Sequence, residues 1–203
     1  MTSYPAQPWH LTAHSYVGIY LVPARLLTPP PPGTKRITVF GRAIVSTAFF
    51  VYEEPSPLTY NEIMATALVR KGWRSYVNIL KIWVDSEASR DGGRELWAIP
   101  KDLADFVVTP HSSYVGAEGG TGIGALSITR VRSLPVGVPI GFRIAQERDN
   151  AVLLTKVRGR GRIGLAKARW TFEPDGPLGY LSGRRSLLTL ALRPLRIVFG
   201  SAD

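Results

Sequence analysis

Apolar and polar residues alternate along this chain in many short spans that are rich in β-branched and aromatic side chains. This period of two predicts β-strands, and the Gly, Pro and Asp-Asn positions between the spans predict turns. Helical spacing is scarce, so short helices are expected only at residues 23–28 and 86–90. The predicted strands are residues 17–22, 37–52, 76–84, 125–131, 140–144, 152–157 and 187–192.

The strand pattern predicts a mainly β (α+β) fold in which a few short helices accompany an antiparallel β-barrel. A closed or nearly closed barrel is favoured because it removes the exposed edges that so many short strands would otherwise present. No polar, low-complexity linker divides the 203 residues. We therefore expect a single domain over residues 1–203.

Composition narrows the chemistry and the location. The chain has no cysteine, which excludes disulfides and thiolate metal sites, and no cluster of His and carboxylate residues suggests a metal. We expect neither a metal nor a cofactor. The N-terminus lacks the basic and apolar regions of a signal peptide, and no apolar run approaches the ~20 residues that cross a bilayer. The expected location is the cytoplasm, with no membrane contact.

Positive charge is concentrated in the C-terminal part. The formal net charge is +10, and residues 130–203 hold 14 Lys and Arg against 5 Asp and Glu, while residues 1–129 hold 11 against 10. Arg158, Arg160 and Arg162 would share one face of a strand and contact phosphates there. The run lacks neighbouring aromatic residues for base stacking, so we expect no nucleic acid partner. Attraction of anionic substrates, or of a carrier protein's acidic surface, is the alternative.

Lys101 is the best candidate for a reactive group. It directly follows Pro100 and ends a run of residues 92–101 that we interpret as strand-like, with Leu96, Trp97 and Ile99 as its apolar members. Loss of hydration among such residues disfavours the ammonium form and lowers the pKa, which would make the lysine a neutral nucleophile. The alternative is a lysine at the end of an edge strand that points its charge to water.

Residues 93–104 resemble the signature of the acetoacetate decarboxylase family, in which Lys101 matches the lysine that forms the Schiff base. Tyr60-Asn61-Glu62 is similar to the family segment that carries an active-site glutamate. Residues 168–172, 177–179 and 183–185 resemble the C-terminal strand and tail of bacterial members. The resemblance spans roughly residues 16 to 200.

The resemblance implies a cone-like antiparallel β-barrel whose interior holds Lys101. It implies a Schiff-base enzyme of lyase type that acts on a small-molecule oxo acid or polyketide-like ketone, with Glu62 as general acid–base. Decarboxylation, aldol addition, dehydration and cyclisation all remain open, as does a place in bacterial natural-product biosynthesis. We expect a homo-oligomer.

Two departures from the family pattern concern the neighbours of the lysine. Asp102 replaces the second lysine that decarboxylases carry, and a carboxylate close to Lys101 would raise its pKa. Alternation along a strand would instead turn Asp102 to the opposite face. The arginine near the start of the first strand is also missing, and the candidates to replace it at the substrate are His14 and Arg25.

A second hypothesis needs no covalent chemistry. In it, the barrel binds an apolar or polyketide-like ligand, or shapes its cyclisation, and Trp83, Trp97 and Tyr60 line the site. Barrels of this kind do enclose single small ligands. This hypothesis predicts that Lys101 is dispensable.

Overall fold

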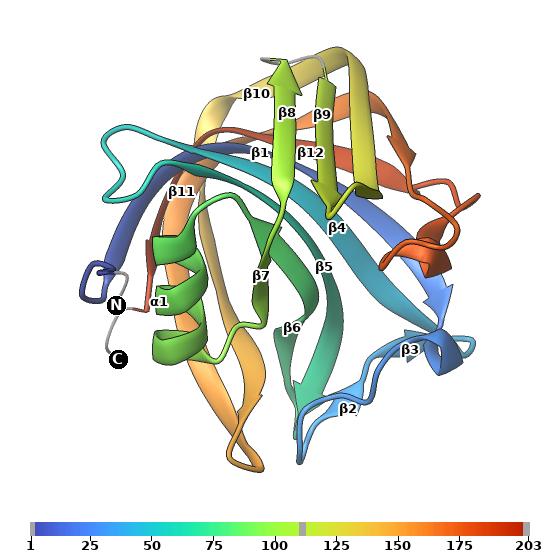
Figure 1. Cartoon of the computed structure of the whole chain (residues 1–203). Helices are drawn as coiled ribbons and strands as arrows, with labels where there is room; N and C mark the ends of the chain where they lie inside the picture. The colour runs from blue at the N-terminus through green and yellow to red at the C-terminus, as the bar shows by residue number, and fades with distance from the viewer. Residues whose placement is uncertain (1–2, 110–112, 201–203) are drawn as a thin grey trace.

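The computed structural model describes residues 3–109 and 113–200, and within them the chain is built mainly of β-strands (Figure 1). The mainly β prediction is confirmed. The elements are β1 Trp9–Pro23, η1 Ala24–Leu26, β2 Lys35–Arg36, β3 Thr38–Val39, β4 Arg42–Glu53, β5 Tyr60–Lys71, β6 Arg74–Val84, α1 Glu87–Trp97, β7 Lys101–Leu103, β8 Asp105–Thr109, β9 Ser113–Glu118, β10 Thr121–Arg148, β11 Ala151–Thr171, η2 Gly179–Leu181 and β12 Leu188–Phe199.

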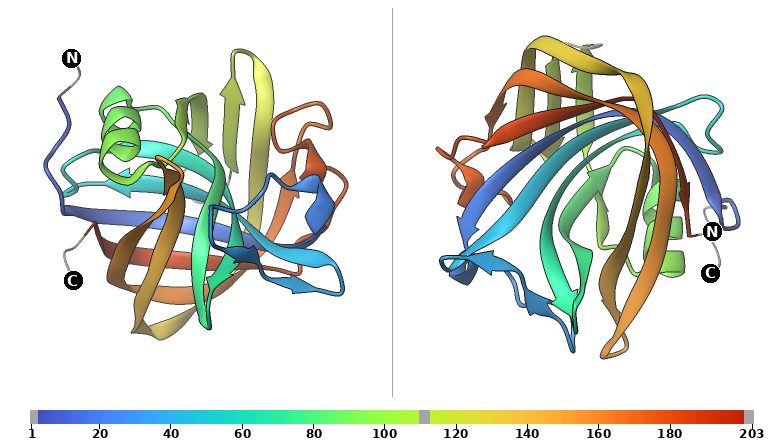
Figure 2. Two further views of the ribbon diagram at one scale, coloured as in Figure 1. Left: turned by 90° about the horizontal axis from the view of Figure 1, so that it is seen from below. Right: turned by 180° about the vertical axis from the view of Figure 1, so that it is seen from behind.

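All the strands belong to one strongly curved sheet, which wraps around an interior in the order β7-β6-β5-β4-β1-β12-β11-β10-β9-β8. Figure 2 shows this wrapping from two further sides, with the long hairpin of β10 and β11 beside the hairpin of β5 and β6. Most neighbours are antiparallel, as expected, but β7 pairs with β6 in parallel. The twisted sheet is not a cleanly closed barrel, because in the described residues one residue pair alone joins β6 to β10, between Val77 and Ile144.

We call this junction of β6 and β10 the seam, and the side chain of Gln146 stabilises it. Its Oε1 accepts hydrogen bonds from the Ile79 backbone N–H and from Asn78 Nδ2, both at 2.9 Å. Its Nε2 donates to the Ile79 carbonyl at 3.2 Å. The side-chain amide therefore pairs with Ile79 as a strand backbone would, and it satisfies polar groups that the missing ladder leaves unpaired.

The two faces of the sheet carry separate hydrophobic cores, because successive side chains of a strand point to opposite sides. On β5, Tyr60 belongs to the core of the interior, and Ile63 and Ala65 belong to the core of the outer face. The outer core is covered by the bent ends of the sheet, including Tyr114 and Trp170. Because each face of β5 packs against one of the two cores, the strand is buried over most of its length.

Helix α1 is longer than the sequence predicts and includes residues interpreted there as strand-like. Ser86 caps its start by accepting a hydrogen bond from the Ser89 backbone N–H, and Ala98 ends it in the left-handed conformation at φ 53°. The cap favours a helix that continues through Gly92 and Gly93 to Trp97. The short helix expected at residues 23–28 is a single 3₁₀ turn, Ala24–Leu26.

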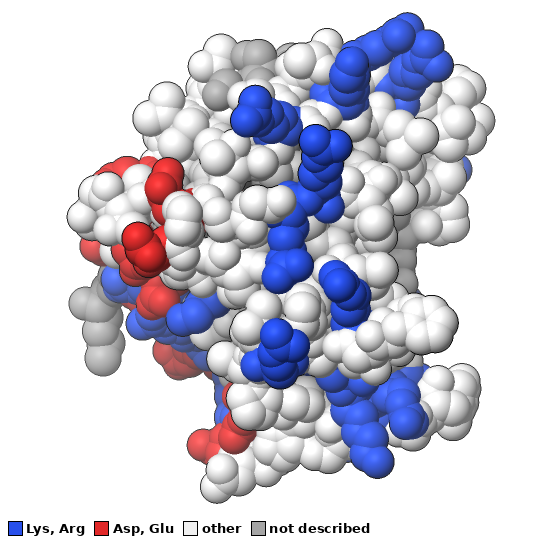
Figure 3. Space-filling view, turned by 90° about the vertical axis from the view of Figure 1, so that its right-hand side faces the viewer, with Lys and Arg blue, Asp and Glu red and all other residues white. Residues whose placement is uncertain are grey.

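Lys and Arg side chains run down the side of the molecule that lies at the right of Figure 1, with Asp and Glu gathered toward one edge of that face (Figure 3). On β11, Arg158, Arg160 and Arg162 are all exposed, as expected for alternate positions of one strand face. Arg160 lies opposite Arg196 of β12. None of the helices in the described residues combines the length and apolar character needed to cross a membrane.

Candidate active site

A cavity of about 230 Å³, here called the central cavity, lies inside the curved sheet. Its wall is formed mostly by apolar side chains of β1, β4, β5, β6, β10 and β12, together with Trp97 at the C-terminal end of α1. No Arg or His is among the described residues that line it. Its polar lining residues are Ser46, Tyr52, Tyr60, Glu62, Thr66 and Lys101.

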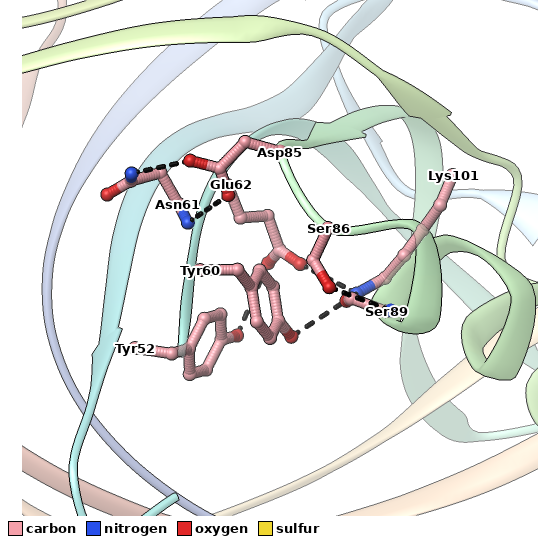
Figure 4. A network of polar contacts seen from close by, with 8 residues as sticks. All are labelled: Tyr52, Tyr60, Asn61, Glu62, Asp85, Ser86, Ser89 and Lys101. Carbon is pink, nitrogen blue, oxygen red and sulfur yellow. Dashed lines mark hydrogen bonds and ion pairs between the residues drawn. The ribbon is translucent and has the colours of Figure 1, made fainter. Parts of the chain in front are cut away.

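Lys101 is buried at one end of the central cavity and holds three polar partners (Figure 4). Its Nζ lies 2.9 Å from Glu62 Oε2 and 2.9 Å from Ser89 Oγ. It also lies 3.4 Å from the Tyr60 hydroxyl and 4.9 Å from the centroid of the Tyr60 ring. The only cation on the described wall of the cavity is therefore paired with the only carboxylate there.

The pKa of Lys101 is raised, which corrects the expectation that burial alone lowers it. Burial does lower the pKa, as the largest single effect, but the Glu62 carboxylate and Tyr60 together outweigh it. Coulombic attraction to Glu62 at this distance in a buried site favours the charged form of Lys101. In the resting state Lys101 is therefore an ammonium held beside Glu62.

The local sequence explains how these groups meet. Glu62 lies two residues after Tyr60 on β5, so both side chains point to the interior. Lys101 begins β7 and lies opposite Ile82 of β6, so it shares the face of Ile82. Because β7 pairs with β6, it brings Lys101 to the Glu62 carboxylate, although the two residues lie 39 positions apart in the sequence.

The link between β5 and α1 is fixed by Asp85. Its carboxylate accepts hydrogen bonds of 2.7 Å from both the backbone N–H and the side-chain amide of Asn61. Asn61 directly precedes Glu62, and Asp85 directly precedes the helix cap Ser86 (Figure 4). This contact holds the start of α1, and with it Ser89, beside Glu62.

Two tyrosines complete the polar end of the cavity. Tyr52 donates a hydrogen bond to Glu62 Oε1 at 3.3 Å, and its ring stacks on that of Tyr60 at 4.4 Å between centroids. Burial raises the pKa of both phenols, and the negative charge of Glu62 raises them further. Lys101 lowers the pKa of Tyr60 without reversing the shift. Both tyrosines therefore stay protonated: the Tyr52 hydroxyl donates to Glu62, and the Tyr60 hydroxyl accepts from Lys101.

Of the predicted site residues, the structure brings Lys101, Glu62, Tyr60 and Trp97 to the central cavity. Trp97 packs edge-on against Trp9 at 4.8 Å and donates a hydrogen bond to Gln7. Ser89 and Tyr52 were not predicted. Tyr52 could have been found from its place opposite Tyr60 on the neighbouring strand, whereas Ser89 depends on how α1 packs.

Three predicted site residues lie elsewhere. Trp83 follows the inward-facing Ile82 and so points to the outer core, where it donates a hydrogen bond to Glu118. His14 is buried on the same outer side, between Glu53 and the Tyr114 hydroxyl. Arg25 is exposed on η1. The expectation that these three line the lysine's pocket is wrong.

Asp102 lies opposite Trp83 in the parallel pairing and therefore faces away from Lys101. Its carboxylate is bound by Arg94, and the side chain is 44% exposed. Asp102 accordingly does not contribute to the raised pKa of Lys101. Within the described parts of the chain, no three His, Asp or Glu side chains cluster in a way that could hold a metal ion.

The fold and the buried lysine together define a class: a curved β-sheet enclosing an apolar cavity with one lysine–carboxylate pair. Residues 25–156, more than half of the chain, match the family described as acetoacetate decarboxylase. The chain belongs to the acetoacetate decarboxylase family.

Solved structures show the same fold at low sequence identity. The acetoacetate decarboxylase of Legionella pneumophila is 16% identical, with a TM-score of 0.71 over 98% of this chain and 87% of that one. An acetoacetate decarboxylase-like enzyme from Sphingomonas wittichii is 20% identical, with a TM-score of 0.66 over 98% and 93%. The enduracididine biosynthesis enzyme MppR, bound to the condensation product of pyruvate and imidazole 4-carboxaldehyde, is 16% identical, with a TM-score of 0.64 over 100% and 90%. Among curated proteins no sequence match is found.

Proposed function

We propose that this protein is a Schiff-base enzyme in which Lys101 condenses with the carbonyl group of an apolar oxo substrate. The observation that carries the proposal is the buried contact of 2.9 Å between Lys101 Nζ and Glu62 at the end of the central cavity. A buried amine beside a proton acceptor, on the wall of an apolar cavity, suits imine formation.

Glu62 activates the amine and removes the oxygen. The Lys101 ammonium transfers a proton to the Glu62 carboxylate, and the neutral amine attacks the substrate carbonyl to give a carbinolamine. Protonated Glu62 then returns the proton to the carbinolamine hydroxyl, which leaves as water. The products are an iminium on Lys101 and the Glu62 carboxylate, so the charges of the resting pair are restored.

The iminium withdraws electrons from the adjacent carbon. Loss of a proton to Glu62, or of carbon dioxide from a β-keto acid, gives a neutral enamine, which then accepts a proton or adds to an aldehyde. MppR holds a condensation product of pyruvate with an aldehyde, which supports keeping carbon–carbon bond formation beside decarboxylation. The hydroxyls of Tyr60 and Ser89, both close to Nζ, are placed to bind the carbinolamine oxygen.

The cavity wall favours a ketone or aldehyde with apolar substituents over a small carboxylate. Its charged residues are already paired with each other, and a buried anion without a cationic partner is strongly disfavoured. The volume of about 230 Å³ equals that of roughly eight water molecules at ~30 Å³ each. An apolar chain fits this space better than acetoacetate, whose carboxylate would have no free cation there.

Borohydride trapping followed by mass spectrometry tests the proposal. The protein is incubated with acetoacetate, pyruvate or methyl octyl ketone, reduced and mapped by peptide. We expect an adduct on the peptide of Lys101, strongest with methyl octyl ketone, in the wild type and in the control Lys81→Ala, where an exposed lysine of β6 is removed. Lys101→Ala should give none. Because Glu62 is left buried in that variant, Lys101→Met/Glu62→Leu serves as a second variant that removes both charges.

The second candidate is a non-covalent ligand-binding protein, and the apolar wall of the central cavity favours it. It predicts no adduct with any of the carbonyl compounds and equal binding of methyl octyl ketone to the wild type and to Lys101→Met/Glu62→Leu. That outcome would replace the Schiff-base proposal.

A further inference from the structure

A second hollow of about 510 Å³, here called the vestibule, lies between two hairpins. One is the turn from β5 to β6, with Trp73 to Tyr76, and the other is the long hairpin of β10 and β11. The two hairpins project side by side from the same end of the sheet (Figures 1 and 2). The vestibule therefore lies at the end of the molecule where the seam leaves β6 and β10 almost unpaired.

The vestibule is basic and aromatic. Arg74, Arg143, Lys156 and Arg158 line it, and none of its described lining residues is Asp or Glu. The guanidinium of Arg74 lies over the Trp73 ring at 5.0 Å from the centroid, and Trp73 is 87% exposed. Arg143, Lys156 and Arg158 also interact with other groups. The attraction of anions to the vestibule therefore depends on its summed positive charge rather than on any single side chain.

The vestibule and the central cavity share a wall. Phe142 and Val157 line both, and Val77 of the cavity directly follows Tyr76 of the vestibule. Along β6, Ile82, which lies opposite Lys101, is five positions after Val77. At a rise of ~3.3 Å per residue the two lie about 16 Å apart. A chain-like ligand with one end at Lys101 therefore reaches toward the vestibule with the other.

We propose that the vestibule binds the anionic end, a carboxylate or a phosphate, of a long amphipathic oxo substrate whose carbonyl reacts at Lys101. The inference rests on the proposed function for the reacting end. The apolar wall between the two sites takes the chain, and the negative group stays in a hydrated basic hollow rather than beside Glu62. This division explains how a substrate with a charge binds to a cavity that has no free cation on its described wall.

Two arms test the proposal. In the first, decanoate and decanol are titrated by isothermal calorimetry into the wild type, Arg74→Ala/Arg158→Ala and the control Arg162→Ala, which removes an exposed arginine of β11 outside the vestibule. We expect decanoate to bind about tenfold more tightly than decanol, or ~1.4 kcal/mol. The double variant should lose most of that preference, and the control should keep it. Added salt should weaken the binding of decanoate but not that of decanol. Decyl phosphate in the same titration distinguishes a phosphate from a carboxylate end.

In the second arm, borohydride trapping compares methyl octyl ketone with the oxodecanoate that carries a terminal carboxylate and a ketone next to the methyl end. We expect faster trapping of the oxodecanoate, and loss of that advantage in the double variant only. Equal trapping of both compounds and equal binding of decanoate and decanol would overturn the vestibule while leaving the Schiff base in place. Absence of any adduct, with a charge preference that Arg74→Ala/Arg158→Ala abolishes, would overturn the Schiff base and support the vestibule.

Discussion

Gly93 lies directly against the side chain of Lys101. A Cβ atom at position 93 would be 2.8 Å from the lysine Cδ and 3.0 Å from its Cε, closer than side-chain atoms pack. The absence of a side chain on this buried position of α1 therefore lets the lysine pass along the helix to Glu62. Helix α1 therefore both carries Ser89 and leaves the space that the Lys101 side chain needs to reach Ser89.

We predict that Gly93→Ala slows trapping at Lys101 by about a hundredfold, because a shift of roughly 1 Å in a reacting group has that effect. Alanine is favoured over glycine in a helix by about 1 kcal/mol, which offsets part of the clash and keeps the protein folded. Adduct formation over time and thermal unfolding measure the two effects separately.

Gly92→Ala is the matched comparison. A Cβ at position 92 would meet the Trp9 ring at 2.7 Å rather than the lysine. It should lower the free energy of unfolding by about 1–3 kcal/mol with a much smaller effect on trapping. Equal rates in the two glycine variants would show that Gly93 has no special role for Lys101.

The ion pair predicts that the free energy of unfolding depends on pH differently in the wild type and in Glu62→Gln. In the wild type, the raised pKa of Lys101 contributes stability that is complete below its ordinary pKa of 10.5 and is lost as pH rises through the folded value. In Glu62→Gln, burial remains without the carboxylate and lowers the pKa, so stability should rise with pH from neutral toward about 10. Near pH 7 we expect this variant to be less stable by about 3–5 kcal/mol.

Urea unfolding near pH 7 and near pH 10 measures the difference between the wild type and Glu62→Gln. Glu147→Gln, at an exposed position near the tip of the β10–β11 hairpin, is the control and should follow the wild type. If Glu62→Gln and the wild type change in parallel, Lys101 and Glu62 do not form the pair described here.

Restoring the family's second lysine should not activate this protein. Because Asp102 faces away from the cavity and is bound by Arg94, we expect Asp102→Lys to leave the rate and pH profile of trapping at Lys101 within about twofold of the wild type. Loss of the exposed ion pair should lower stability by about 1 kcal/mol or less. A gain in rate of about tenfold would contradict the orientation of β7.

The seam offers a further prediction. Gln146→Leu leaves the Ile79 N–H and carbonyl without their partner, while Asn78 Nδ2 keeps its hydrogen bond to the Ala145 carbonyl; each buried unsatisfied group costs about 1–3 kcal/mol. We expect a loss of roughly 3 kcal/mol in the free energy of unfolding and faster hydrogen exchange at the Ile79 amide. Thr129→Ala, which removes an exposed side-chain hydrogen bond to the Lys167 carbonyl on β11, should have little effect.

Much of the architecture could be predicted from the sequence, because the period of two in the strands is a local property. The meeting of Lys101 with Glu62 could be predicted only through the resemblance, since the two are 39 residues apart and only the pairing of β5, β6 and β7 joins them. The face of Trp83 is set by its alternation with Ile82, which the sequence alone does not place inside or outside. The C-terminal end of β6, residues 82–84, is buried on both faces and has no polar side to reveal which face is inside.

The charge state of Lys101 could not be predicted for a related reason. Burial and the neighbouring Asp102 are visible in the sequence, but the dominant opposing contribution comes from Glu62 on another strand. Helix α1 was underestimated because Trp97 and Ile99 suggest a strand, whereas the Ser86 cap and the two buried glycines fix a helix through tertiary packing. Ser89 reaches the lysine only as a result of that packing.

Gln146 has a consequence for how relatives of this protein can diverge. Where two strands share a full ladder, the width of the enclosed space is fixed by backbone spacing, and changing it requires insertions. Here the side-chain amides of Gln146 and Asn78 span the gap between β6 and β10. A single codon change at Gln146 can therefore alter how closely the two strands approach, so the width of the enclosed space can evolve without any change in chain length.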